Sequence, residues 1–270
     1  MLRDITIGQY YPTDSVIHKL DPRVKLFGTV LYIISIFIAK NSIVYMLAIA
    51  FLFTCIWISK VPVKYILRGL KAILILLAMS LVFNLFLTEG RVIVSFWKLK
   101  ITYEGIVQAI YMGLRLILLI MGSSLMTLTT TPNSLTDGLE KALGFLKKIK
   151  IPVHEIAMMM SIALRFIPIL IEETDKIMKA QMARGADFEE GNFLKRIKAM
   201  IPLLVPLFVS AIRRATELAS AMEARCYNGG NGRTKMKPLK YKKRDGIAYL
   251  ILFAYLGMII GAKILWNYIF

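Results

Sequence analysis

The chain has 270 residues, of which 57% are hydrophobic, and its mean hydropathy is +0.62. A typical globular domain is about half apolar, so this composition excludes an ordinary water-soluble protein. The formal charge is +18, from 35 Lys+Arg against 17 Asp+Glu, but the cations flank apolar segments and form no separate basic domain. That arrangement favours anionic lipid head groups over nucleic acid as the partner. We predict an integral membrane protein that binds no nucleic acid.

The N-terminal 15 residues are too polar for a cleavable signal peptide, so the first apolar block is expected to act as its own insertion signal. Before that block, Asp21 is a good helix N-cap and Pro22 suits the first helical position. Two cysteines, Cys55 and Cys226, lie far apart and the chain has only two histidines. We expect reduced cysteines, no metal site and no cofactor.

Five apolar blocks are predicted to be transmembrane helices, although several are nearer 16 than the usual ~20 residues. The blocks are residues 24–39, 43–58, 66–87, 106–130 and 247–264. Lysines at their edges can reach the head groups and compensate for the short length. The sequence therefore predicts an all-α fold with about five spans. Between the third and fourth blocks, residues 98–104 alternate polar and apolar, which indicates a small hairpin or extended loop.

The distribution of Lys and Arg predicts the orientation in the membrane. Most cations precede the first block, separate the second from the third, or lie in residues 131–245, and these regions are predicted to be cytoplasmic. The few that would lie outside are Lys40, Arg91, Lys98, Lys100 and Lys263. The N-terminus is therefore expected inside and the C-terminus, after five spans, outside.

Arg115 is the one strong charge deep inside a predicted span. An ionised residue at that depth is a functional candidate, and it could bind an anionic substrate in a stand-alone secondary carrier. A helix–helix hydrogen bond or snorkelling to the interface explains it equally well. The sequence has no Ser/His/Asp set, no Cys/His set and no Gly-rich phosphate loop, which argues against a membrane-bound enzyme.

Residues 131–227 are predicted to form a cytoplasmic module of one short and two long amphipathic helices. Asn133 or Ser134 is expected to cap the short helix, which runs to about Lys148. The long helices cover residues 153–184 and 193–226, and each would be close to 50 Å long. If both crossed the membrane, their basic connection would lie outside, against the positive-inside tendency. We therefore expect them to lie along the membrane surface.

The two long helices end in nearly the same way, with Ala183-Arg184-Gly185 and with Glu223-Ala224-Arg225. A single Arg at a helix C-terminus is explained by the helix dipole. A pair, on helices whose small residues permit close crossing, predicts two arginine ends that dock onto a paired cytosolic partner. Pro168, Pro202 and Pro206 lie inside these helices and predict bends, which either fit the membrane surface or act as hinges. The sequence does not decide between these two roles.

These features resemble the transmembrane T component of energy-coupling factor (ECF) transporters. The resemblance rests on four motifs: the segment from His18 to Lys25, Leu164-Arg165-Phe-Ile-Pro168, Ala183-Arg184-Gly185 and Glu223-Ala224-Arg225. It implies a non-catalytic scaffold in the cell membrane of a prokaryote. It also implies three kinds of partner: two cytosolic ATPase subunits, a membrane-embedded S component that captures a vitamin or metal ion, and the lipid bilayer.

The resemblance assigns Arg184 and Arg225 to contacts with the ATPase subunits, and Ala183, Gly185, Glu223 and Ala224 to shaping those contacts. The candidate structural or coupling residues are Arg165, Pro168, Pro202, Pro206 and Arg115. Cys226 stands where the family's pattern has Gly, so we expect the second helix to end differently from the first.

Three segments are predicted along the chain: residues 1–130 with the first four spans, the coupling module 131–227, and residues 228–270 with the last span. The imported substrate is not predictable, because another chain would bind it.

Overall fold

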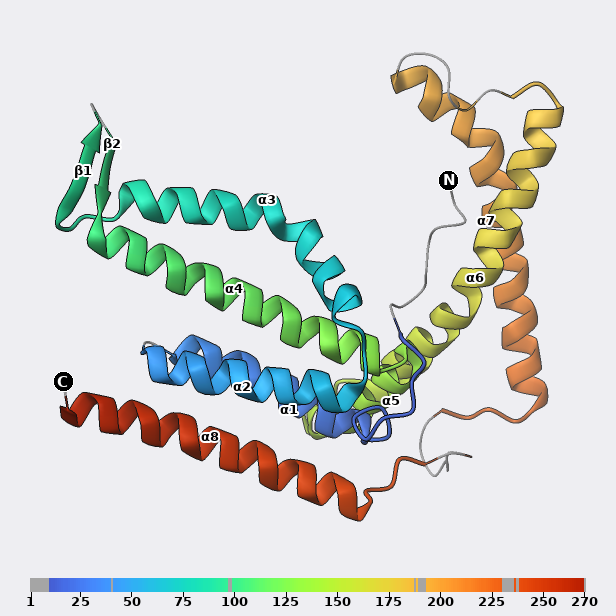
Figure 1. Cartoon of the computed structure of the whole chain (residues 1–270). Coiled ribbons are helices and arrows are strands. Elements are labelled where there is room, and N and C mark those ends of the chain that lie inside the picture. The colour runs from blue at the N-terminus through green and yellow to red at the C-terminus, as the bar shows by residue number, and fades with distance from the viewer. Residues whose placement is uncertain are drawn as a thin grey trace. The chain divides into compact units, whose positions relative to one another are not determined.

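The computed structural model describes residues 10–39, 41–96, 99–186, 188, 193–229, 236 and 238–269. In chain order its elements are α1 (Pro22–Ile38), α2 (Ser42–Ser59), α3 (Val63–Leu87), β1 (Val92–Phe96), β2 (Leu99–Thr102), α4 (Tyr103–Thr129), α5 (Pro132–Ala142), the 3₁₀ helix η2 (Leu143–Ile149), α6 (Val153–Ala183), α7 (Phe193–Ala224) and α8 (Lys243–Ile269) (Figure 1). They form two compact units. The first, here called the membrane unit, comprises Gly8–Leu139 and Leu239–Phe270; the second, the helix-pair unit, is built around Glu140–Pro238.

The helices confirm the prediction of an all-α membrane protein. In the described part of the chain, five are long and apolar enough to cross a membrane: α2, α4, α6, α7 and α8. The bent helix α3 makes a sixth if its two halves, which meet at 63°, count as one span. Helix α1, with 17 residues, lies at the short end for a span. That α1 crosses, and that α6 and α7 lie along the surface, stay predictions from the charge distribution.

The helix starts follow from local capping chemistry. The Asp21 carboxylate accepts a hydrogen bond from the Arg23 backbone N–H, and Pro22 is the first residue of α1, which confirms the predicted cap. The cap of α5 was predicted at Asn133 or Ser134, slightly too late in the chain, since the Thr131 hydroxyl accepts the Ser134 N–H at 3.3 Å. The short helix also changes type at Leu143, where α5 gives way to η2. Glycines at 138 and 144 weaken α-helical propensity in this stretch.

The connection between α3 and α4 contains the predicted hairpin. Strands β1 and β2 pair antiparallel, with Phe96 opposite Leu99 and Val92 opposite Thr102, and a register shift lies between Val92 and Val94. The Thr102 side chain then accepts the Gly105 N–H and starts α4. The hairpin prediction is therefore confirmed in its backbone. Lys40 and Lys98, which were expected on the outside, fall beyond the described residues.

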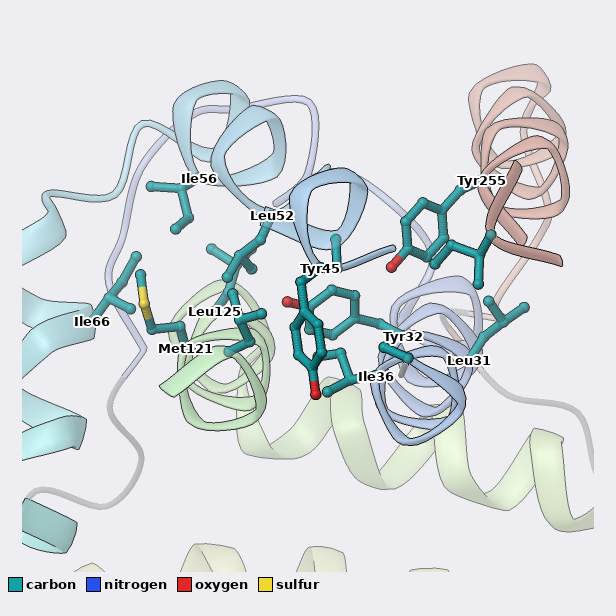
Figure 2. Close-up of a cluster of buried hydrophobic side chains, with 14 of the residues drawn as sticks. Leu31, Tyr32, Ile36, Tyr45, Leu52, Ile56, Ile66, Met121, Leu125 and Tyr255 are labelled. Atoms are coloured by element: carbon teal, nitrogen blue, oxygen red, sulfur yellow. The ribbon is translucent and has the colours of Figure 1, made fainter. Parts of the chain in front are cut away.

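One hydrophobic cluster holds the membrane unit together (Figure 2). The ring of Tyr255 on α8 stacks on Phe51 of α2 at 4.1 Å between centroids, and its hydroxyl lies 2.9 Å from Ser35 Oγ on α1. Gly122 of α4 faces the ring of Tyr32, where a Cβ would have no room. Helix α8, from the far end of the chain, is thereby packed against α1 and α2.

Candidate functional site

Helices α6 and α7 run antiparallel and cross (Figure 1). The Gln181 side chain on α6 donates to the Pro202 carbonyl of α7 at 3.3 Å. Farther along, the Glu173 carboxylate on α6 accepts from both Ser210 and Arg214 of α7, the latter at 2.9 Å. A residue late in α6 therefore contacts one early in α7, and this order fixes where the two helix ends lie.

The small residues of α7 face α6 as predicted. Ala211, Ala215 and Ala219 line a cavity of about 330 Å³ opposite Ile162 and Phe166 of α6. Small side chains at such positions bring two helices close together. Ala180 and Ala183 of α6 do not line this cavity, so of the predicted small residues it is those of α7 that face the other helix there.

Helix α6 ends at Arg184, which is its C-cap. The Gly185 N–H donates to the Met182 carbonyl and the Ala186 N–H to the Gln181 carbonyl, both at 3.0 Å. Gly185 has φ +88°. This bonding, with a left-handed residue after the cap, is a Schellman motif.

Helix α7 ends in the same motif at Arg225. The Cys226 N–H donates to the Glu223 carbonyl at 2.8 Å and the Tyr227 N–H to the Met222 carbonyl at 3.0 Å. Cys226 has φ +58° and occupies the position that Gly185 has in α6. The expectation that Cys226 would make this helix end differently is therefore wrong. The strain of a left-handed cysteine, ~1–2 kcal/mol, is offset by the hydrogen bonds of the motif.

The two arginine ends are exposed and far apart. All residues predicted for the contact are exposed: Ala183, Arg184, Gly185, Glu223, Ala224 and Arg225. Because α6 and α7 are antiparallel, the end of α6 lies beside the first third of α7, where Gln181 contacts Pro202, and Arg225 lies at the far end of α7. At a rise of 1.5 Å per residue, the distance along α7 between the two arginine ends is about 40 Å. The structure thus presents two like-shaped cationic ends at two distinct places on one unit.

Replacement of Cys226 by glycine is expected to stabilise the protein. Glycine adopts the left-handed conformation without the steric cost, so Cys226→Gly should raise the free energy of unfolding by about 1 kcal/mol. Thermal unfolding of the purified protein would measure it, with Gly185→Ala, which should destabilise, as the opposite control. A lower melting temperature for Cys226→Gly would contradict the assigned helix end.

The candidate coupling prolines lie within continuous helices. Pro168 is inside α6, and Pro202 and Pro206 are inside α7. All three are exposed, as is Arg165. The Pro202 carbonyl, which accepts from Gln181, belongs to the contact between the two helices, so Pro202 lies at this helix crossing.

Arg115 is bonded within the membrane unit. Its guanidinium donates to the Ala39 carbonyl at 3.1 Å and to the Tyr45 hydroxyl at 3.2 Å. It thereby links α4 to α2 and to the end of α1, which matches the helix–helix interpretation. Arg115 also lines an open cavity of about 580 Å³, together with Glu104 and Tyr111. That Arg115 binds an anionic substrate in a stand-alone carrier stays a prediction.

Loss of the Arg115 side chain is expected to destabilise the membrane unit. Arg115→Leu leaves the Ala39 carbonyl and the Tyr45 hydroxyl without this donor, which should cost about 1–3 kcal/mol of unfolding free energy. Thermal unfolding in detergent would measure the loss, with the exposed Arg91→Leu as control. Unchanged stability together with abolished uptake would instead favour a role in binding an anion.

The segment around His18 ties α1 to the end of α4. The Lys25 ammonium donates to the His18 carbonyl at 3.1 Å and to the Thr129 carbonyl at the end of α4 at 2.7 Å. Burial lowers the pKa of the His18 imidazole, which bonds to Ser15 and to the Tyr11 carbonyl. Because the protonated imidazole is disfavoured, this segment should hold a neutral histidine at neutral pH.

Asp245 on α8 is a structural residue that sequence reasoning missed. It is 1% exposed, and its carboxylate accepts the Asp21 N–H at 2.9 Å and the Lys242 N–H at 2.7 Å. Burial raises the pKa of Asp21, but hydrogen bonds from Arg23 outweigh it and hold that pKa below its usual value. The starts of α1 and α8 are joined at this point.

Sequence reasoning also missed the contact between Glu173 on α6 and its two partners on α7, Ser210 and Arg214.

The fold and site define a class of protein: a multi-pass membrane protein built of helices, apart from one small hairpin, with two exposed, matching arginine helix ends. The family model for CbiQ, described as a cobalt transport protein, matches residues 13–236, and the chain belongs to this family. An energy-coupling factor transporter transmembrane protein EcfT of Clostridium kluyveri is 53% identical over 269 residues, which cover 99% of this chain and 100% of the relative.

Relatives of the same description occur in other bacteria. Those of Bacillus subtilis and Lactococcus lactis are 48% and 47% identical, and each alignment covers 91% of this chain and 93% of the relative. The resemblance inferred from the paired motifs is thereby confirmed. The chain is a transmembrane component of an energy-coupling factor transporter.

Proposed function

We propose that this chain is the coupling scaffold of an ECF-type importer, in which Arg184 and Arg225 each dock one of two cytosolic ATPase subunits. The observation that carries the proposal is the pair of matching, exposed helix ends, about 40 Å apart. One arginine for each subunit of an ATPase pair requires two equivalent points at separate places. The chain itself carries out no reaction.

The chemistry of the ends suits such docking. Arginine presents a planar fork of donors that binds a carboxylate or backbone carbonyls in two directions. Small neighbours, Ala183 and Gly185 at one end and Ala224 at the other, leave the guanidinium open to a partner. Glu223 adds an acceptor beside Arg225. In this proposal the N-terminus and the helix-pair unit face the cytosol, as the cation distribution predicts.

An S component that captures a vitamin or a metal ion would pack on apolar surface. Helix α7 exposes a continuous set of large apolar side chains around its two prolines: Met200, Ile201, Leu204, Val205, Phe208, Val209 and Ile212. Exposed apolar surface of this extent marks a protein or membrane contact. ATP-driven movement of the ATPase pair would shift α6 and α7 and so reorient the S component.

The proposal is tested by affinity purification of the tagged chain from native membranes, with identification of the proteins that accompany it. Two ATPase subunits and at least one small membrane-embedded substrate-binding protein are expected. Purification of the chain alone, with transport by that chain in liposomes lacking any ATPase, would instead establish a stand-alone carrier.

The contact at Glu173 is expected to matter for transmission of movement. Glu173→Gln keeps an acceptor for Ser210 but removes the charge that pairs with Arg214, so α6 and α7 can slip against each other. Uptake should fall about fivefold, equivalent to ~1 kcal/mol in the rate-limiting barrier, while ATPase subunits still copurify. Glu172→Gln, at the exposed neighbouring position, is the matched control. Equal uptake by the two variants would contradict a coupling role for Glu173.

A further inference from the structure

A basic hollow lies in the membrane unit. It has a volume of about 600 Å³ and is lined by Asp14, Ser15, Val16, Lys19, Trp57, Ile58, Lys60 and Arg244. The lining comes from three places in the sequence: the segment before α1, the end of α2 and the start of α8. Because these are helix ends, the hollow lies where the apolar segments give way to polar chain, at the depth of lipid head groups.

The charges of the hollow do not balance. Lys19 forms an ion pair with Asp14 at 3.1 Å, and Asp14 is the one carboxylate among the lining residues. Neither Lys60 nor Arg244 pairs with a carboxylate among the described residues, and the Arg244 Nε is buried without a hydrogen-bond partner. Two cations on the wall of one hollow therefore remain without a counter-charge, which favours an anion there.

A further cation increases this excess. Arg244 lies close enough to the Lys25 ammonium for the two to repel each other. Asp21 offsets part of that repulsion, but it is itself paired with Arg23 at 2.9 Å, and Asp245 accepts two backbone N–H groups. A phosphate group between Lys60 and Arg244 would satisfy the unpaired donors.

The rim of the hollow is apolar and indicates what carries the phosphate. Trp57 is 83% exposed, and Val16 and Ile58 are also exposed. Tryptophan is enriched at membrane interfaces because its ring packs on lipid while its N–H reaches the head groups. A free phosphate ion would gain nothing from these side chains, whereas the glycerol and upper acyl chain of a lipid would pack on them.

From this geometry we propose that the hollow is a binding site for the head group of an anionic phospholipid. Lys60 and Arg244 contact its phosphate, and Trp57 packs on its glycerol and acyl chains. The bound lipid bridges the end of α2 and the start of α8. Such a lipid would hold together two helices that are far apart in the sequence.

The test uses the full chain with Trp57 as its single tryptophan, after Trp97→Phe and Trp266→Phe, reconstituted in phosphatidylcholine vesicles. Brominated phosphatidylglycerol should quench Trp57 fluorescence at lower mole fraction than brominated phosphatidylcholine does. In the Lys60→Gln/Arg244→Gln variant this preference should fall, by about fivefold for each cation removed. Lys64→Gln/Lys243→Gln removes the same charge from exposed positions outside the hollow and should keep the preference.

Three results would overturn the proposal. The first is equal quenching by the two brominated lipids. The second is the same loss of preference in both double variants, which would assign the effect to overall surface charge. In the third, inorganic phosphate displaces brominated phosphatidylglycerol from Trp57 at millimolar concentration, which would identify a site for free anions.

Discussion

Arg184→Glu combined with Arg225→Glu is expected to release both ATPase subunits and abolish uptake, while the chain still inserts in the membrane. Each reversal removes a charge-assisted contact and places like charge against the partner's acceptor groups. Loss of one partner of a hydrogen-bonded charge pair at an interface costs roughly 2–5 kcal/mol. The double variant should therefore lower affinity for the ATPase pair by more than about a thousandfold. Copurification and uptake in cells measure the two effects.

The matched control changes the same charge elsewhere in the helix-pair unit. Lys148 on η2 and Arg213 on α7 are exposed, and neither belongs to the Ala-Arg ending of a helix. Lys148→Glu with Arg213→Glu should leave assembly and uptake near the wild-type level. If both double variants lost the ATPase subunits equally, the cause would be overall charge and the assigned role of the arginine ends would be wrong.

Asp245→Ala is expected to be the most destabilising single change in the membrane unit. It would leave the Asp21 and Lys242 N–H groups without their acceptor, in a place where the Asp245 side chain is almost fully buried. An unsatisfied buried donor costs about 1–3 kcal/mol, so the two donors together should cost about 2–6 kcal/mol of unfolding free energy. The yield of folded protein and its melting temperature in detergent measure the loss.

Asp245→Asn serves as the graded control, because its single carbonyl oxygen can still accept one of the two hydrogen bonds. It should recover about half of the loss in unfolding free energy. Asp14→Ala removes an exposed carboxylate and should cost less than about 1 kcal/mol. An Asp245→Ala protein as stable as Asp14→Ala would show that the contact between α1 and α8 is not required for folding.

The helices were predictable because their signals are local. Apolar blocks, the Asp21-Pro22 start and the alternation before α4 each depend on residues within a few positions of one another. The structure extends the predicted spans by a few residues, as from Ile66 to Val63 at the start of α3. Helix ends fray, and their bounds are the least precise part of such predictions.

The long-range contacts were not predictable from one sequence. Asp245 meets Asp21 across 224 positions, and Glu173 meets Ser210 across 37. Neither carboxylate stands in a recognisable motif, and only the packing of the helices brings each to its partner. Hydropathy likewise leaves α6 and α7 undecided between spans and surface helices, since both are long and apolar enough to cross.

The candidate site was predictable in its residues but not in its geometry. The repeated Ala-Arg ending located Arg184 and Arg225, whereas the antiparallel crossing that separates them depends on Glu173, Gln181 and their partners on α7. Cys226 shows the limit of residue preferences: glycine is favoured in a left-handed cap, but a cysteine is tolerated when the surrounding hydrogen bonds specify that conformation.

The most direct measurement is photo-crosslinking in native membranes from single positions. A photoreactive residue at position 184 and, in a separate variant, at position 225 should each crosslink to an ATPase subunit, and one at position 213 should not. Crosslinks from both helix ends are the result expected for a scaffold that docks a pair of subunits at two points. No crosslink to an ATPase subunit from either end, or a crosslink from position 213 alone, would contradict docking at the two arginine ends.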